Sequence, residues 1–439
     1  MRPLRILCLL GGYGEEHIGG AIHREMARDI RARGHDYQIL VPARAEEVGR
    51  PPEALEEGIP VHRVVCSGSF VFDVVNRATT PLFRFPSLLT LASRLGRFLR
   101  SQPPFDVLIA EGAYPLGTVA WLSAHRARVP CILSIVGGDF LANEEANYGF
   151  ARYALPRRLM RASLGAAAVV RAISPLAGER AVALGCPRDR LALVPRNIAA
   201  GAFLPAGADR TVFRREARQR LAARLGTGDG ALVVAVGRLL PIKGFDVLVR
   251  ALPRIAASVA GVRLLLVGPN RVDSRFGDYR QHLEGLALGA AVGDRLSFAG
   301  SVPLEQVRDL LAAADVVAIP SLEEGGNKVL LEAAAVGTPF VATRTAGNAA
   351  WAREWNCGVV VEPSSAEGLA GSITRLLEEP HRAAVLGENG LRFADHFRTA
   401  PVAERILALC RVAAKRARLP LELREPFALL HPQAPPSPG

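Results

Sequence analysis

Residues 232–244 read LVVAVGRLLPIKG: five apolar residues, a glycine, two cations (Arg238 and Lys243) and a second glycine. A short unbroken apolar run is typical of a strand buried on both faces, and the glycine predicts a turn after it. Residues 245–257 then have helical character. A buried strand, a turn and a helix form the repeating unit of a doubly wound α/β sheet, so this stretch predicts the fold of its half of the chain.

The same unit recurs on both sides of this stretch. Before it, we expect a helix at 21–33 and strands at 6–10, 37–41, 61–65, 106–110 and 131–136. After it, we expect a helix at 304–314 and strands at 263–267, 296–298, 316–319, 339–343 and 358–361. Continuous apolar strands that alternate with helices indicate parallel sheets covered on both faces. We therefore predict two Rossmann-like, doubly wound domains that face each other across a cleft.

The two series are separated by a stretch rich in alanine, glycine and proline, which is typical of a hinge. We predict an N-terminal domain over 1–198, a linker over 199–208 and a C-terminal domain over 209–395. Residues 396–418 are expected to form a helix that crosses back to the N-terminal domain. The proline-rich tail 419–439 is expected to be irregular.

Composition excludes several classes of protein. The net charge is +12, but the basic residues are dispersed and are not interleaved with aromatic residues, so no nucleic-acid partner is expected. No apolar run reaches about 20 residues, and the apolar start of the chain runs into Gly11-Gly12 like a buried strand, not a signal peptide. The six cysteines form no CxxC pair, which favours reduced thiols in a cytoplasmic protein without a zinc site.

Lysine is rare in this chain. Only three of its 54 basic residues are lysines, and two of them, Lys243 and Lys328, lie next to glycine-containing motifs. An ammonium group is a compact point charge on a flexible stem, which suits an oxyanion such as phosphate. The alternative is a chance placement in a chain that is rich in arginine.

The second motif, residues 324–332, reads EGGNKVLLE and enters a helix. Gly325, Gly326 and Asn327 would leave free backbone N–H groups at that helix N-terminus, which is a natural anion site. Glu324 and Glu332 could accept hydrogen bonds from hydroxyl groups. Together with Arg238 and Lys243, this set suits a ligand that carries both phosphates and sugar hydroxyls; a solvated ion-pair surface is the alternative.

Two familiar nucleotide motifs are missing. Residues 12–17 begin as G-x-G-x-x but end in His17, and the strand at 37–41 leads to no ribose-binding acid, so NAD binding is not expected. The chain also contains no P-loop sequence. Gly19 and Gly20, before the first helix, would still let a ligand approach the backbone closely, although a tight turn is an equal alternative.

The motifs at 237–244, 267–268, 300–303, 314–316, 320–325 and 332–333 resemble the nucleotide-sugar-binding domain of GT-B glycosyltransferases. The closest group is the retaining glycosyltransferase family 4, the glycosyl transferases group 1. The resemblance is strong over about 230–365 and moderate over the first 200 residues, through Gly19-Gly20, Asp106-Val107 and Gly137-Gly138-Asp139.

The resemblance implies a donor site for a UDP- or GDP-sugar without a metal or other cofactor. Cations and a helix dipole would replace the metal ion. In this reading Arg238 and Lys243 hold the diphosphate. Glu324 binds hydroxyls of the transferred sugar and Glu332 binds the ribose. The other donor-binding residues implied are Gly237, Val302 (by its backbone, toward the base), Gly325, Gly326, Asn327 and, within reach of phosphate or pointing to solvent, Lys328.

On the acceptor side, the resemblance implies a loop at Gly19 and Gly20, and a fourth catalytic residue in Asp139. A helix N-cap before Phe140 is an alternative for Asp139. The chain departs from the family pattern at Val136, where many members have histidine, and at Gly326-Asn327, where a Phe-Gly pair is usual. A non-catalytic nucleotide-sugar-binding protein and a nucleotide-sugar 2-epimerase therefore remain alternatives to the glycosyltransferase, although the acids and histidine expected of an epimerase are not evident.

The acceptor itself is left open as a glycan, a lipid-linked sugar or a small molecule. Residues 86–100 place five apolar side chains on one face and three arginines around the other; these are Leu88, Leu91, Leu95, Phe98 and Leu99, with Arg94, Arg97 and Arg100. This pattern predicts either an ordinary helix packed on the sheet or a helix on the cytoplasmic membrane surface that brings a lipid-linked acceptor to the enzyme.

Overall fold

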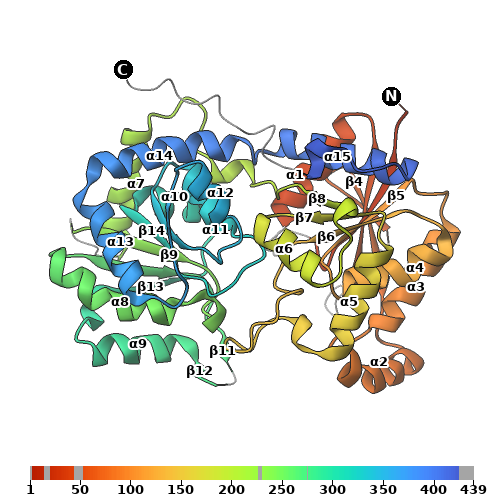
Figure 1. The fold of residues 1–439 in the computed structure, drawn as a ribbon, viewed down its shortest axis with the longest axis horizontal. Helices are drawn as coiled ribbons and strands as arrows, with labels where there is room; N and C mark the ends of the chain where they lie inside the picture. The colour runs from red at the N-terminus through yellow and green to blue at the C-terminus, as the bar shows by residue number, and fades with distance from the viewer. Residues whose placement is uncertain (1, 14–19, 44–52, 226–229, 274, 425–439) are drawn as a thin grey trace. The chain divides into compact units, whose positions relative to one another are not determined.

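The computed structural model describes residues 2–13, 20–43, 53–225, 230–273 and 275–424 (Figure 1). The chain divides into two compact units. The first comprises Met1–Glu144, Tyr148–Asn197 and Thr399–Gly439, and the second comprises Glu145–Asn147 and Ile198–Arg398. Each unit is built on a parallel sheet with helices on both faces, so the predicted α/β fold class is confirmed.

The first unit contains an eight-stranded sheet in the order β3-β4-β2-β1-β5-β6-β7-β8. Neighbouring strands are parallel except β3, which pairs antiparallel with β4. The strands are β1 (Arg5–Leu9), β2 (Asp36–Ala43), β3 (Glu53–Glu56), β4 (Ile59–Val65), β5 (Val107–Glu111), β6 (Cys131–Ile135), β7 (Val169–Ala172) and β8 (Leu191–Leu193). The antiparallel edge strand corrects the prediction of a purely parallel sheet.

Alternation along the strands sends side chains to two separate cores. On β1, Leu7 and Leu9 join one apolar cluster, whereas Ile6 and Cys8 join the other, as the two-residue period of a strand requires. The first cluster contains residues of α3, α4, α5 and α6, and the second contains residues of α1 and α15. The helices are α1 (Gly20–Ala32), α2 (Phe70–Phe83), α3 (Leu88–Ser101), α4 (Leu116–Ala127), α5 (Ala154–Ala166), α6 (Pro175–Ala183) and α15 (Thr399–Lys415).

The second unit contains a six-stranded parallel sheet in the order β13-β10-β9-β14-β15-β16, which is the Rossmann order. Its strands are β9 (Leu232–Val236), β10 (Arg263–Val267), β13 (Leu296–Gly300), β14 (Val316–Ile319), β15 (Phe340–Thr343) and β16 (Val359–Val361). Its main helices are α7 (Arg210–Leu225), α8 (Phe245–Ser258), α9 (Tyr279–Gly289), α10 (Leu304–Ala313), α11 (Lys328–Ala335), α12 (Ala349–Glu354), α13 (Ala366–Glu378) and α14 (Pro380–Asp395).

In both sheets the order in which successive strands are added reverses between two central strands. In the second unit this switch lies between β9 and β14, and in the first it lies between β1 and β5. Ligands of open α/β sheets bind at the carboxyl ends of the strands that flank such a switch. The loops after β9 and β14 therefore mark the candidate donor site.

The carboxyl-terminal segment is more ordered than the sequence predicts. Helix α15 packs on α1 and on β5, β6 and β7 of the first unit. A short helix, α16 (Leu421–Arg424), follows it, and Leu419 and Leu423 are buried in the same core as α15. The prediction of an irregular tail is thus wrong for 419–424, because these leucines bury apolar surface; residues 425–439 lie outside the described part of the chain.

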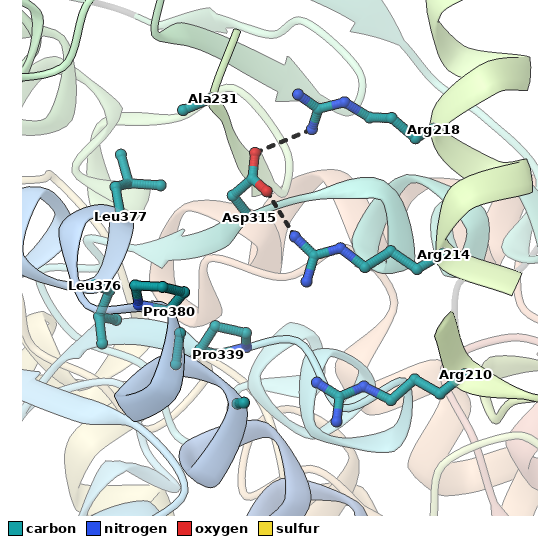
Figure 2. Close-up of a pocket in the computed structure, with 11 residues that line it drawn as sticks. Arg210, Arg214, Arg218, Ala231, Asp315, Pro339, Leu376, Leu377 and Pro380 are labelled. Carbon is teal, nitrogen blue, oxygen red and sulfur yellow. Dashed lines mark hydrogen bonds and ion pairs between the residues drawn. The ribbon is translucent and has the colours of Figure 1, made fainter. Parts of the chain in front are cut away.

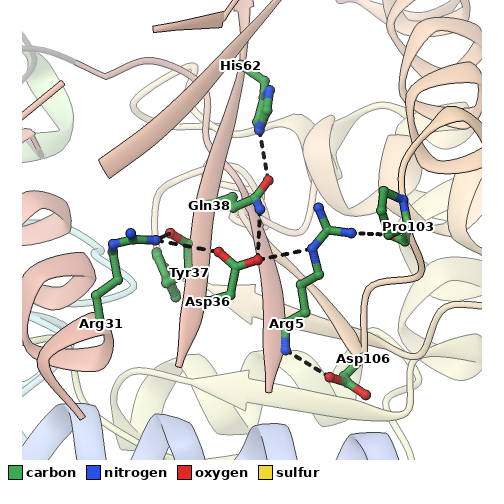
Figure 3. A network of polar contacts seen from close by, with 8 residues as sticks. All are labelled: Arg5, Arg31, Asp36, Tyr37, Gln38, His62, Pro103 and Asp106. Atoms are coloured by element: carbon green, nitrogen blue, oxygen red, sulfur yellow. Dashed lines mark hydrogen bonds and ion pairs between the residues drawn. The ribbon is translucent and has the colours of Figure 1, made fainter. Parts of the chain in front are cut away.

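The amino ends of the first unit's strands are held together by a polar network (Figure 3). The Asp36 carboxylate accepts hydrogen bonds from Arg5 (3.0 Å) and from the Gln38 amide (2.9 Å). The side-chain amide oxygen of Gln38 lies 2.8 Å from Nε2 of His62, and the backbone N–H of Arg5 donates to the Asp106 carboxylate (2.8 Å). These contacts join β1, β2, β4 and the start of β5, so the charges at this edge serve the sheet itself.

Candidate active site

The loop after β9 contains one glycine, Gly244, that no other residue could replace without strain. Gly244 has φ +64°, and a Cβ at this position would collide with the carbonyl oxygen of Pro320. The N–H of Gly237 donates to Val267 (2.8 Å), and a Cβ there would lie 3.4 Å from Cε of Lys243. Close backbone approach at these two positions brings the Lys243 side chain to the end of β14.

Lys243 and Glu324 meet directly. The Nζ atom of Lys243 lies 2.6 Å from Oε2 of Glu324, and the two side chains are 17% and 13% exposed. The second oxygen of the carboxylate accepts a hydrogen bond from the Asn327 amide (2.6 Å) and one from the Ser321 hydroxyl. Two residues that are 81 positions apart in the sequence therefore form one half-buried, charge-paired centre.

Helix α11 begins at this centre and is capped by Asn327. The side-chain amide oxygen of Asn327 accepts the N–H of Leu330 (2.9 Å), while the backbone N–H of Asn327 donates to the side-chain amide oxygen of Asn348 (2.7 Å). The prediction of a free N–H at Asn327 is therefore wrong, because Asn348, from the loop after β15, occupies it. Gly347 packs against the backbone of Gly326 and leaves no space for a Cβ.

Lys328 and Glu332 form a second pair one helical turn further on. Nζ of Lys328 lies 2.9 Å from Oε1 of Glu332, whose side chain is only 3% exposed. Burial raises the pKa of Glu332, and the Lys328 ammonium opposes this shift. The structure therefore pairs Lys328 with a buried carboxylate, and its reach to a phosphate stays a prediction.

The remaining predicted donor residues lie at the same edge of the sheet. Arg238 is half-buried and directly follows Gly237 after β9. Val302 comes two residues after the end of β13, whose Gly300 accepts the N–H of Gly268 (2.8 Å). All the predicted donor-side residues thus lie at the carboxyl edge of one sheet.

In the first unit, Asp139 follows β6 but does not cap a helix. Its carboxylate accepts the N–H groups of Tyr114 (3.0 Å) and Ala113, in the loop after β5, and that of Gly137 (3.2 Å), just after β6. Burial raises the pKa of Asp139, and these backbone donors oppose the shift. The alternative of an N-cap before Phe140 is wrong, because the segment after Asp139 forms a turn and not a helix.

The predicted acceptor loop is only partly within the described chain. Gly20 is buried and begins α1, whereas Gly19 lies outside the described residues. The residues that follow Gly20 carry a polar group that sequence reasoning missed. Nε2 of His23, on the first turn of α1, lies 3.0 Å from Nη2 of Arg196.

The polar group that contains His23 and Arg196 also contains a buried ion pair. Arg171, on β7, lies 3.0 Å from Oε1 of Glu111, and the side chains are 4% and 8% exposed. Arg196 lies 4.0 Å from the other carboxylate oxygen. Burial works to raise the pKa of Glu111, but Arg171, His23 and Arg196 outweigh it and the pKa is lowered. In the sequence, the only indication of this pair is a charged residue in each of two apolar strands: Arg171 inside β7 and Glu111 at the end of β5.

A cavity of about 310 Å³ lies at the opposite, amino edge of the second sheet (Figure 2). Arg214 and Arg218 of α7 reach Asp315, just before β14, at 2.6 Å and 3.1 Å. Arg218 also donates to the carbonyl oxygens of Ala313 (2.9 Å) and Gly230. These contacts fasten α7 to the starts of the strands, at the edge where substrate sites of this fold do not lie.

Comparison with known proteins agrees with this arrangement. A model of the family "Glycosyl transferases group 1" matches residues 218–393, and one of the "Glycosyl transferase 4-like domain" matches residues 19–197. A D-inositol 3-phosphate glycosyltransferase of Rhodococcus erythropolis is 30% identical over 319 residues, which is 72% of this chain and 70% of that protein. This chain belongs to the glycosyl transferases group 1 family. It is a GT-B enzyme of glycosyltransferase family 4, and the predicted resemblance is confirmed.

Other relatives of this glycosyltransferase extend the comparison. A GDP-mannose-dependent alpha-(1-6)-phosphatidylinositol monomannoside mannosyltransferase of Mycolicibacterium smegmatis is 28% identical over 74% of this chain and 79% of that protein. Sucrose-phosphate synthase of Thermosynechococcus elongatus has the same fold, with a TM-score of 0.74, 22% identity, and coverage of 93% of this chain and 98% of that chain. Family membership supports a nucleotide-sugar-dependent glycosyltransferase, and not the epimerase or the non-catalytic alternative.

Proposed function

We propose that this glycosyltransferase moves a sugar from a UDP- or GDP-sugar, without a metal ion, to a hydroxyl group of a phosphorylated or lipid-linked polyol. The single observation that carries the donor half is the contact between Lys243 and Glu324 (2.6 Å) at the carboxyl edge of the second sheet. It supplies one mobile cation and one hydroxyl-accepting carboxylate where the fold binds its ligands.

The proposed chemistry follows from these charges. Transfer breaks the bond between the anomeric carbon and a phosphate oxygen, so negative charge develops on the departing diphosphate. Lys243 and Arg238 would stabilise this charge, and a fixed cation beside developing charge lowers the barrier because it needs no reorganisation. Glu324, held in place by Asn327 and Ser321, would accept hydrogen bonds from the sugar hydroxyls. Glu332 would do the same for the ribose.

The acceptor half of the proposal has two supports. The names of two relatives specify D-inositol 3-phosphate and a phosphatidylinositol monomannoside, which are both polyols that carry a phosphate. In this chain, Arg196 and His23 lie 3.0 Å apart beside the start of α1, over the buried Arg171–Glu111 pair. Two arginines and a histidine around one carboxylate form a cationic group that suits an anionic acceptor.

A direct assay tests this proposal. Purified enzyme is incubated with UDP- or GDP-hexoses and with inositol phosphate or phosphatidylinositol, and the released nucleotide diphosphate and the glycosylated product are measured. We expect one nucleotide series to support transfer and the phosphorylated polyol to be preferred to free inositol. Transfer to free inositol at the same rate would contradict the anionic acceptor, and absence of transfer from every nucleotide sugar would contradict the donor assignment.

Membrane contact, if the acceptor is lipid-linked, is better supported at α2 than at 86–100. Helix α3 buries Leu88, Leu91 and Leu95 in the core, so its apolar face is not available to a bilayer. The structure shows no helix, among the residues it describes, that is long and apolar enough to span a membrane. The ordinary packed helix is thus the correct reading of 86–100.

Helix α2, in contrast to α3, exposes several of its apolar side chains. Phe70 is 84% exposed and Val71 is 64% exposed, and Val74 and Leu82 lie on the same outward side. From Phe70 to Ser101 the chain carries five arginines and one acid, Asp73. An apolar face bordered by arginines complements an anionic bilayer surface, and we propose that α2 contacts such a surface on the cytoplasmic side.

Vesicle co-sedimentation tests the role of α2. We expect the protein to sediment with phosphatidylglycerol vesicles and not with phosphatidylcholine vesicles, and Phe70→Ser with Val71→Ser to abolish the effect. Leu288→Ser is a matched control, because Leu288 is equally exposed on α9 of the second unit. Equal sedimentation of the double variant and the wild type would contradict the proposal, as would loss of self-association in the double variant without any vesicle binding by the wild type.

A further inference from the structure

The first unit contains a cavity of about 710 Å³ whose lining includes none of the residues assigned above to the donor or acceptor site. It is lined by the ends of α4, α5 and α15 and by residues that directly precede β6, β7 and β8. The cavity therefore opens at the amino edge of the eight-stranded sheet. The switch point between β1 and β5 lies at the carboxyl edge, so this cavity is separate from the expected acceptor site.

The floor of this cavity is apolar and uncharged. Leu133 and Leu419 are buried in its wall, and Trp121 of α4 lines it as well. The hydroxyl of Ser163 donates to the carbonyl oxygen of Met160 (3.0 Å) and is thus already satisfied. Burial raises the pKa of the Cys131 thiol to about 12, so this group stays neutral. Such a floor holds an apolar group better than it holds a sugar or water.

The rim of the same cavity is cationic. Arg128, Arg416 and Arg418 are exposed, and among the residues that the structure describes none of their side chains has a hydrogen-bond or ion-pair partner. Arg190 also lines the cavity, and Asp189 is its one acidic residue. Unpaired guanidinium groups beside a concave surface attract anions with planar, oxygen-rich heads.

The wall between rim and floor is held in place by Arg190. Its Nη1 donates to the carbonyl oxygens of Gly165 (2.8 Å) and Ala167 (3.1 Å). These bonds fix the turn between α5 and β7 that forms one side of the cavity. A volume of about 710 Å³ is in the range of small-molecule sites, roughly 300–1,000 Å³.

We propose that this cavity binds a small amphiphilic anion, with its apolar body on the floor beside Trp121 and its phosphate, sulfonate or carboxylate head at Arg128, Arg416 and Arg418. An uncharged ligand would leave the three guanidinium groups without a partner. A compact inorganic anion would leave the apolar floor in contact with water. The chemistry of the two surfaces together selects a ligand that has both parts.

The probe for this site is 1-anilinonaphthalene-8-sulfonate, which combines an aromatic body with one sulfonate. We expect saturable binding of one molecule per chain with energy transfer from Trp121, and displacement by dodecyl phosphate. Arg416→Glu with Arg418→Glu is expected to weaken binding at least about tenfold, because attraction at two positions becomes repulsion. Arg254→Glu with Arg344→Glu, which changes two exposed arginines of the second unit, is the matched control and should leave binding unchanged.

Three results would overturn the proposal. One is unchanged binding in the Arg416→Glu, Arg418→Glu variant, which would show that the rim does not hold the anion. Another is equal displacement by dodecyl maltoside, which has the same chain without a charge. The last is full energy transfer in Trp121→Phe, or loss of binding in Phe70→Ser, either of which would place the dye elsewhere. Circular dichroism of each variant checks that the fold is retained.

Discussion

The two edges of the six-stranded sheet pair their carboxylates with different cationic side chains. At the carboxyl edge, Lys243 and Lys328 each contact a glutamate, at 2.6 and 2.9 Å. At the amino edge, Arg214 and Arg218 converge on Asp315 (Figure 2). One edge uses lysine ammonium groups beside glycine-shaped loops, and the other uses arginine forks.

This difference distinguishes a candidate ligand-binding site from a set of ion pairs that stabilises the fold. Asp315 accepts bonds from two arginines and from the N–H of Leu232 (2.7 Å), and Arg218 also binds two carbonyl oxygens. Those groups are occupied in holding α7 to the strands. A lysine on a flexible stem can leave its carboxylate for a phosphate at a small cost in geometry, because it has no planar fork to align. We therefore expect changes at the carboxyl edge to affect catalysis and changes at the amino edge to affect stability.

The largest expected effect is at the carboxyl edge. Lys243→Ala should lower kcat/KM for transfer by about 100- to 1,000-fold, because the departing diphosphate loses a cation that stabilises it. Thermal unfolding should be close to wild type. Lys415→Ala, which removes the exposed lysine at the end of α15, is the matched control and should keep full activity. Near wild-type turnover by Lys243→Ala would remove the distinction between the two edges.

A pair of substitutions replaces lysine with arginine at the carboxyl edge and arginine with lysine at the amino edge. Lys243→Arg keeps the charge, yet we expect it to lower kcat/KM by about tenfold or more, because the planar guanidinium fork cannot take the place of the compact ammonium group that lies 2.6 Å from Glu324. Arg214→Lys should leave kcat/KM unchanged. Full activity of Lys243→Arg would show that charge alone matters there.

At the amino edge the expected loss is in stability. Asp315→Ala removes the partner of Arg214, Arg218 and the Leu232 N–H, and should lower the unfolding free energy by about 1–3 kcal/mol. Urea unfolding measures this loss, with Asp294→Ala as a control in a short 3-10 helix of the same unit. Donor affinity, measured at a temperature where both proteins are folded, should not change. A lower donor affinity without a loss of stability would reverse the assignment.

The smallest expected effect concerns Glu332 and pH. Its folded-state pKa is raised, so its protonated form favours the folded protein below the ordinary glutamate pKa. This contribution to the unfolding free energy is lost as pH rises through the raised pKa of Glu332, because ionising the buried carboxyl group costs free energy. Glu332→Gln cannot ionise, so its unfolding free energy should lack this decline over the same interval. Parallel pH profiles of wild type and variant would contradict the shift.

The sequence predicted part of this molecule from local signals. The apolar runs at β9, β10 and β14, and the glycine turns after β9 and β10, lie where they were expected. Strand β3 was missed because its sequence, EALE, has a glutamate at each end and no apolar alternation that would indicate a strand. The pair Arg171 and Glu111 was missed because each residue lies in a different strand, and nothing in either segment indicates the other.

The sequence by itself determined the α/β class, the restart of the pattern in the second half, and the residue types of the donor motif. Each of these depends on the order of apolar and glycine residues over a few positions, which local burial and backbone freedom decide. Only the tertiary structure decided that Lys243 binds Glu324 and that Asn348 takes the N–H of Asn327. Those partners come from loops after different strands, and the packing of parallel strands sets which loops meet.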